Sequence, residues 1–196
     1  MRAFRSAVTI GVIAVVPLAF TPSAYAAGGI GRAHDNIAWA ESTAAHPTTR
    51  EVAFGVVAAL GDTVDQTNQA VAYNHDCTGC RSVAIAFQAV LVPSTPTRVV
   101  PENVAVTVND NCNGCNGFSY AEQYVVSSNG RTRLDGRTMD GIERIRDQAE
   151  RIARSSADDA TKTSQLADLA NKFEALVKAS LTRGPVDRDD RDWSDA

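Results

Sequence analysis

The stretch Asn68-Gln-Ala-Val-Ala-Tyr-Asn-His-Asp-Cys-Thr-Gly-Cys80 decides the predicted fold, because the chain repeats it 35 residues later. The second copy, residues 103–115, keeps the alternating apolar residues, the asparagines at both ends of that run and the Cys-x-Gly-Cys ending. Each copy continues into an apolar stretch that carries a glutamine at the matching place, Gln88 and Gln123. The two stretches are therefore copies of one structural unit, and they hold all four cysteines of the chain.

A third, weaker copy lies upstream and has no cysteines. Its first asparagine, Asn36, precedes Asn68 by 32 residues, and Asn68 precedes Asn103 by 35 residues. Spacings of this size are typical of stacked supersecondary units. We place the three units at about residues 36–60, 68–92 and 103–128, within a repeat domain that covers residues 27–130.

Each unit is predicted to be a β-hairpin. Apolar and β-branched residues flank a glycine-containing turn, and Asn113-Gly114 is a strong hairpin signal. In such a hairpin, Ala72 would pair with Ile85, a small residue opposite a large one. Apolar side chains occur at both parities, so we expect both faces of the strands to be covered. The predicted fold class is α+β, an antiparallel sheet of three repeated β-hairpins followed by a helical hairpin.

The repeated asparagines and the two glutamines have two interpretations. They can be strand-end and cross-strand hydrogen bonders, or they can form a polar ladder that meets a ligand. The residues alone do not separate these alternatives.

The chain changes to a helical pattern after residue 130. Met139, Ile142 and Ile145 begin one apolar stripe at helical spacing, and Leu166 to Leu181 carry a second. We expect a helical hairpin over residues 131–183, ended by Gly184-Pro185. The remaining segment, residues 184–196, is rich in aspartate and is predicted to be a disordered acidic tail.

The N-terminus is typical of an export signal. Arg2 and Arg5 precede an apolar run over residues 8–20, which ends in Ala24-Tyr-Ala26. The sequence predicts a signal peptide over residues 1–26 and cleavage after Ala26. The product would be a secreted or cell-surface protein with no membrane span after cleavage.

The charge balance of the exported chain disfavours nucleic-acid binding. Without the two N-terminal arginines, 17 basic residues stand against 23 acidic residues. Proteins that bind nucleic acid broadly need an excess of lysine and arginine to displace counterions from the phosphates. The chain also contains no HExxH, Gly-x-Ser-x-Gly, P-loop or GxGxxG motif, so no catalytic residue is predicted.

The cysteines leave three possibilities open. One is a disulfide at each turn, Cys77 with Cys80 and Cys112 with Cys115, because residues i and i+3 of a tight turn lie close enough to be bridged. Another is a zinc site of all four thiolates, since two CxxC turns can supply a tetrahedral set of sulfurs. The last is a redox-active dithiol.

The units resemble a group of actinobacterial exported proteins that often carry the label "putative peptide zinc metalloprotease protein". The resemblance rests on residues 64–73, 77–92 and 103–115 and extends over about residues 36–181. It implies no established activity, and only the four cysteines map onto the motif of the group.

From these observations we expect a non-enzymatic secreted or cell-surface module without a cofactor, which contacts a protein or cell-envelope partner. One alternative is a zinc-binding protein associated with a peptidase system. Another is an extracytoplasmic CxxC thiol oxidoreductase.

Overall fold

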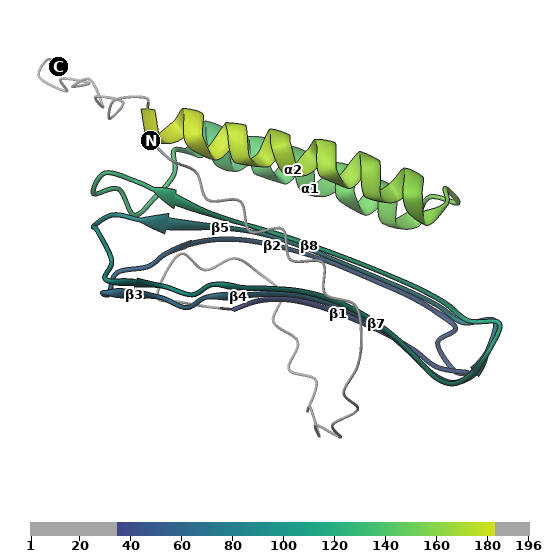
Figure 1. Cartoon of the computed structure of the whole chain (residues 1–196). Helices are drawn as coiled ribbons and strands as arrows, with labels where there is room; N and C mark the ends of the chain where they lie inside the picture. Colours follow the sequence, from purple (N-terminus) through teal and green to yellow (C-terminus); the bar gives the residue numbers. More distant parts are fainter. Residues whose placement is uncertain (1–34, 183–196) are drawn as a thin grey trace, which may run out of the picture.

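The computed structural model describes residues 35–182, which form a stack of parallel strands covered by two helices (Figure 1). The predicted signal peptide and acidic tail lie outside these residues. Among the described residues, no helix is both long and apolar enough to cross a bilayer. The elements are β1 (Asn36–Ser42), β2 (Thr48–Ala58), β3 (Thr63–Val64), β4 (Thr67–Thr78), β5 (Arg81–Val92), β6 (Arg98–Val99), β7 (Glu102–Asn113), β8 (Asn116–Ser127), α1 (Gly136–Arg154) and α2 (Asp159–Thr182).

The strands are wound as three coils, where a coil is one passage of the chain through both large sheets. The first coil contains β1 and β2, the second β4 and β5, and the third β7 and β8. One sheet has the strand order β1-β4-β7 and the other has the order β2-β5-β8, while β3 and β6 pair in the loops between coils. Every pairing is parallel and follows the repeat, so that Asn36, Asn68 and Asn103 occupy one register position.

The predicted antiparallel sheet of three β-hairpins is therefore wrong. The strands β4 and β5, which flank the first cysteine turn, belong to different sheets. Ala72 pairs with Ala40 and Thr107 rather than with Ile85, and Ile85 pairs with Val52 and Tyr120. The turn carries the chain from one sheet to the other. The predicted hairpin would instead have reversed the chain within a single sheet. Copies of one sequence can then pair with each other along their whole length, which places like side chains side by side.

Small side chains fill the space between the two sheets near the middle of the coils. The residues are alanines, all of them fully buried: Ala38, Ala40, Ala70, Ala72, Ala84 and Ala86. Because alanine projects only a methyl group, the two sheets can approach closely here. The inner faces of both sheets are covered in this way, but the expectation that both faces of every strand are covered fails for the β1-β4-β7 sheet, whose outer face exposes Ile37, Val106 and Val108.

Polar ladders run through the same interior. Asn36 donates through Nδ2 to Oδ1 of Asn68 at 2.7 Å, and Asn68 donates in the same way to Asn103 at 2.8 Å. Asn68 also donates to the carbonyl oxygen of Ala86 in the opposite sheet, at 3.2 Å. Asn68 is fully buried, so these bonds replace the water that its amide has lost. The ladder therefore ties the coils to one another and the two sheets together.

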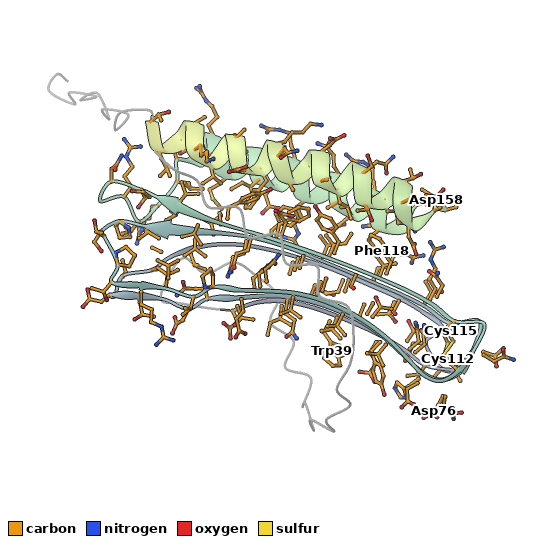
Figure 2. The ribbon with its side chains drawn as sticks, viewed as in Figure 1. Trp39, Asp76, Cys112, Cys115, Phe118 and Asp158 are labelled. Atoms are coloured by element: carbon orange, nitrogen blue, oxygen red, sulfur yellow. A yellow bond between two sulfur atoms is a disulfide. The ribbon has the colours of Figure 1, made fainter. Side chains whose placement is uncertain are left out.

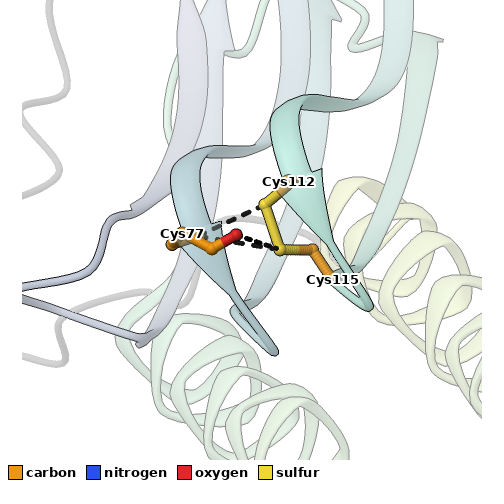
Figure 3. Close-up of side chains that lie close together, drawn as sticks. All are labelled: Cys77, Cys112 and Cys115. Carbon is orange, nitrogen blue, oxygen red and sulfur yellow. Dashed lines mark hydrogen bonds between the residues drawn. A yellow bond between two sulfur atoms is a disulfide. The ribbon is translucent and has the colours of Figure 1, made fainter.

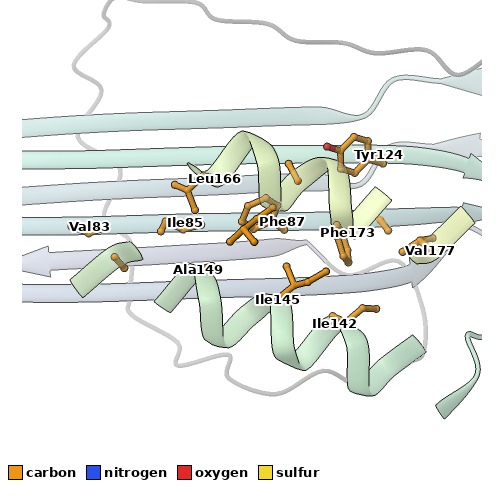
Figure 4. Packing of buried hydrophobic residues seen from close by; sticks show 14 of the residues in the cluster. Val83, Ile85, Phe87, Tyr124, Ile142, Ile145, Ala149, Leu166, Phe173 and Val177 are labelled. Carbon is orange, nitrogen blue, oxygen red and sulfur yellow. The ribbon is translucent and has the colours of Figure 1, made fainter. Parts of the chain in front are cut away.

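The two predicted helices are present and cover the outer face of the β2-β5-β8 sheet (Figure 4). Phe87 of β5 stacks on Phe54 at 4.7 Å between ring centroids, and Phe173 of α2 meets Phe54 edge-on at 5.6 Å. Asp135 caps α1 by accepting a hydrogen bond from the backbone amide of Thr138 at 2.7 Å. This layer buries the large apolar side chains of the protein on one side of the coil stack.

Candidate functional site

The cysteines lie in the turns that connect the two sheets at one end of the coils. Gly79 and Gly114, the third residues of the two Cys-x-Gly-Cys turns, have φ angles of 68° and 66°. Side chains with a Cβ rarely adopt this backbone conformation, so the glycines let the chain turn sharply between sheets. Asp76 and Asn111 also have positive φ angles, which shows that the two turns share one geometry.

The stacking of coils brings Cys77 of one turn next to Cys112 and Cys115 of the next (Figure 3). Within each turn the structure places the two sulfurs at disulfide distance, with Cα–Cα separations of 6.1 Å for Cys77 and Cys80 and 5.8 Å for Cys112 and Cys115. Between turns, the sulfur of Cys77 lies 3.2 Å from that of Cys112 and 3.6 Å from that of Cys115. The four sulfurs therefore form one cluster, which we call the sulfur cluster.

Once both pairs are reduced, the sulfur cluster would supply the thiolate donors that a thiophilic metal requires. The sulfurs of Cys77, Cys112 and Cys115 all lie within 4.8 Å of one another. Tetrahedral zinc with sulfur at about 2.3 Å separates its ligands by about 3.8 Å. The Cys77 sulfur lies near this spacing from Cys112 and Cys115, at 3.2 Å and 3.6 Å, whereas the sulfurs within each turn are at bonding distance and would have to move apart after reduction. The sulfur of Cys80 lies 3.5 Å from the carbonyl oxygen of Thr43 in the cysteine-free first coil.

A histidine connects the first and second coils beside the cluster. His75 Nε2 lies 2.8 Å from Glu41 Oε1, and His75 Nδ1 lies 3.3 Å from Asp76 Oδ2. These hydrogen bonds to carboxylates raise the pKa of His75 above its ordinary value, with the bond to Glu41 the larger cause. A hydrogen bond from Asn111 and another from His75 lower the pKa of Asp76. This network joins all three coils through side chains.

An aromatic row continues from His75 across the outer face of the β1-β4-β7 sheet. Tyr73 stacks on His75 at 4.9 Å between centroids, and Trp39 meets Tyr73 edge-on at 6.3 Å. Figure 2 shows Trp39 on the face turned away from the helices, and Phe118 on the side toward them. Burial, followed by the nearby carboxylate of Asp110, raises the pKa of Tyr73.

The third coil leaves one end of the stack open. No strand among residues 35–182 pairs with the outer edges of β7 and β8. Ala105, Thr107 and Asn109 share register positions with the buried residues Ala70, Ala72 and Asn74, yet they are exposed. The third-coil end, defined as the outer edges of β7 and β8 and the side chains between them, therefore exposes the inside of the fold.

The opposite end of the stack, formed by β1 and β2, differs in the burial of its interior side chains and in its charge. Ala38 and Ala40 of β1, at the register positions of Ala105 and Thr107, are fully buried. The edge strands there also carry charges, with Glu41 in β1 and the pair Arg50 and Glu51 in β2. Charged residues on an edge strand discourage pairing with further strands. The two ends are therefore unlike.

Comparisons with protein-family models, with curated proteins and with solved structures found no match to this chain.

The structure brings together three of the four predicted site cysteines, Cys77, Cys112 and Cys115, with Cys80 next to Cys77 alone. It adds two features that the sequence interpretation missed. One is the contact between the two turns, since isolated hairpins offered no reason for Cys77 to meet Cys112. The other is the third-coil end, together with the link from His75 to Glu41. The signal that could have revealed both is the repeat itself, because in-register stacking of units places residues 35 apart side by side.

Proposed function

We propose that this protein is a non-enzymatic secreted or cell-surface module that binds a protein partner through its third-coil end. The observation that carries the proposal is the exposure of Ala105, Thr107 and Asn109, whose counterparts in the second coil are buried. An edge strand presents unpaired backbone amides and carbonyls that can pair with another strand. A partner that adds strands here would bury side chains that belong inside the fold.

The outer face of β7 adds apolar contact area at the same place. Val106 and Val108 are 38% and 40% exposed, and both lie on the face that carries Trp39. Backbone pairing along the edge would supply affinity, and the valines would supply side-chain contacts with the partner.

Site-specific photo-crosslinking tests this proposal. A photoreactive residue in place of Val108, in the chain exported by its native host, is expected to give a discrete protein adduct. The same residue in place of Lys172, on the exposed side of α2, is the matched control and should give none. Equal labelling at both positions, or no adduct at Val108, would contradict the proposal.

The second candidate is a zinc-binding protein associated with a peptidase system, and the sulfur cluster favours it. Three sulfurs lie within 4.8 Å of one another, and Cys80 belongs to the same pair of turns. Reduction of the pairs would release four thiolates next to each other, a ligand set that suits zinc.

Elemental analysis of chain purified anaerobically with reductant and zinc tests this candidate. One zinc per chain, lost in a Cys112→Ser variant, would support it. Metal below a tenth of an equivalent would exclude it. Thr78→Ser in the same turn is the control, because it leaves all four sulfurs in place.

A third candidate is a thiol oxidoreductase. One observation favours it, the 3.2 Å separation of the Cys77 and Cys112 sulfurs. In such a reaction, one reduced cysteine pair would pass two electrons to a substrate disulfide and itself become a disulfide. Insulin reduction that a Cys77→Ser variant abolishes would favour this activity, and an inert wild-type chain would exclude it.

A further inference from the structure

We propose that the partner at the third-coil end is a second copy of this chain, bound third coil to third coil as a closed two-fold dimer. This inference rests on the function proposed above and names its partner. In the dimer, β7 pairs antiparallel with the partner's β7, and β8 pairs antiparallel with the partner's β8. The two sheets then continue across the interface.

The shape of the third-coil end favours another coil over a single peptide. The end presents two strand edges at once, one in each sheet, with Thr107 Oγ1 of β7 and Ser119 Oγ of β8 only 3.0 Å apart between them. A single added strand could satisfy one edge and would leave the other unpaired. A second third-coil end offers two edges at the same separation, so both can pair together.

The composition of the end also favours association. Residues 102–127 contain no lysine, arginine or proline, so that of the charged residues and prolines with which natural edge strands discourage pairing only carboxylates are present. Their three carboxylates are Glu102, Asp110 and Glu122. Asparagine, valine and threonine, which are uncharged, make up most of β7.

The first-coil end is the less suitable partner surface. It carries Glu41, Arg50 and Glu51, and its interior alanines are already covered. Glu51 occupies the register position of Ala84, which lies between the sheets in the next coil. A coil stacked onto this end would have to accommodate that charge in its interior, which is costly.

The helix layer independently argues for a closed dimer over an open filament. Three strands span about 14 Å of stack, whereas two packed helices need about 16–20 Å. In a head-to-tail filament this mismatch would accumulate with every copy. A two-fold dimer has a single junction, where the partner's α2 lies next to α2, and the excess width can extend beyond the two outer ends.

The exposed valines select the register. If the two-fold axis passes through Thr107, Val106 lies opposite the partner's Val108, and Val108 lies opposite the partner's Val106. The four valines exposed at this end then form two cross-strand pairs. In this register Asp110 lies opposite the partner's Val104 and Glu102 opposite the partner's Cys112, so neither carboxylate of β7 faces a carboxylate of the partner's β7.

Sedimentation of the exported chain, with variants chosen by register, tests the dimer. The wild type is expected to be a dimer. Val106→Lys and Val108→Glu should each raise the dissociation constant of the dimer about tenfold or more, because the two-fold axis places each substitution at two positions in the interface. Mixing the two variants should restore the dimer, because the lysine introduced in one chain then faces the glutamate introduced in the other. Ile37→Lys alters an apolar residue of similar exposure in β1 and is expected to leave the dimer intact.

Each other outcome has a definite meaning. A monomeric wild type, dissociation by Ile37→Lys alone, or a mixture that stays monomeric would overturn the inference. Far-ultraviolet circular dichroism of every variant separates dissociation from unfolding. A photo-crosslink from Val108 to a different protein, with a monomeric wild type, would overturn the dimer and leave the proposed function standing. The absence of any adduct would remove both.

Discussion

The sulfur of Cys77 lies 3.2 Å from the sulfur of Cys112, the residue that occupies the same turn position one coil later. The two residues are 35 positions apart in sequence, so the contact is produced by the winding of the chain and not by the local turn. The same winding aligns the asparagines and exposes the third coil. The fold, the sulfur cluster and the open end are therefore consequences of one parallel register.

The two cysteine pairs are expected to react in a fixed order. Cys80 is 1% exposed and Cys77 8% exposed, whereas Cys112 and Cys115 lie in the last coil and are partly exposed. A reductant should therefore reach the third-coil pair first. Stepwise reduction, alkylation and peptide mass spectrometry would show Cys112 and Cys115 modified before Cys77 and Cys80. Modification of all four at the same rate would contradict the burial difference.

Replacement of the central asparagine should destabilise the fold strongly. Asn68→Ala removes the bonds to Asn36, Asn103 and the Ala86 carbonyl, and it leaves buried polar groups without partners. We expect a loss of about 3 kcal/mol in the free energy of unfolding, measured by urea denaturation.

The matched control for this change is Asn109→Ala at the exposed third coil. Asn109 accepts one hydrogen bond from Asn74 at 2.6 Å, so its removal should cost about 1 kcal/mol. Equal losses for the two variants would show that the ladder is not buried as described.

The hydrogen bonds of His75 to Glu41 and Asp76 should stabilise the protein more at low pH than at high pH. The folded pKa of His75 is raised above its unfolded value near 6.5 by hydrogen bonds to Glu41 and Asp76. Its contribution is therefore fully present below the unfolded pKa and is lost as the pH rises through the folded pKa. Wild type should exceed His75→Gln in unfolding free energy by more at about pH 5.5 than at about pH 9. A pH-independent difference would mean that the protonated histidine contributes nothing.

Much of the local structure could be predicted, but not the way the strands pair. Strands on both sides of the cysteine turns and two helices after residue 130 follow from periodicity, and the structure contains both. The predicted strand pairing was wrong at Asn113-Gly114, because a glycine turn between apolar runs is equally compatible with a hairpin and with a passage of the chain from one sheet to the other. In the assumed hairpin, large residues lay opposite small ones, such as Ile85 opposite Ala72. This size match favoured a strand pairing that the structure does not contain.

The sequence signal for the correct pairing lies in residues far apart along the chain. Asn68 and Asn103 are identical and stack on each other in the structure, and apolar residues at both parities are typical of parallel strands. For the site, the sequence identified the four cysteines, and the open edge of β7 could not be foreseen. Whether a strand has a neighbour depends on the whole stack and not on its own residues.

Nuclear Overhauser contacts in the isotope-labelled protein test the parallel coil most directly. Parallel stacking of the coils predicts inter-strand contacts between backbone protons of residues around Ala70 and those around Ala105, and between residues around Ala86 and those around Ala121. Backbone contacts linking Ala72 with Ile85, together with the absence of those between coils, would show hairpins instead and would contradict the account.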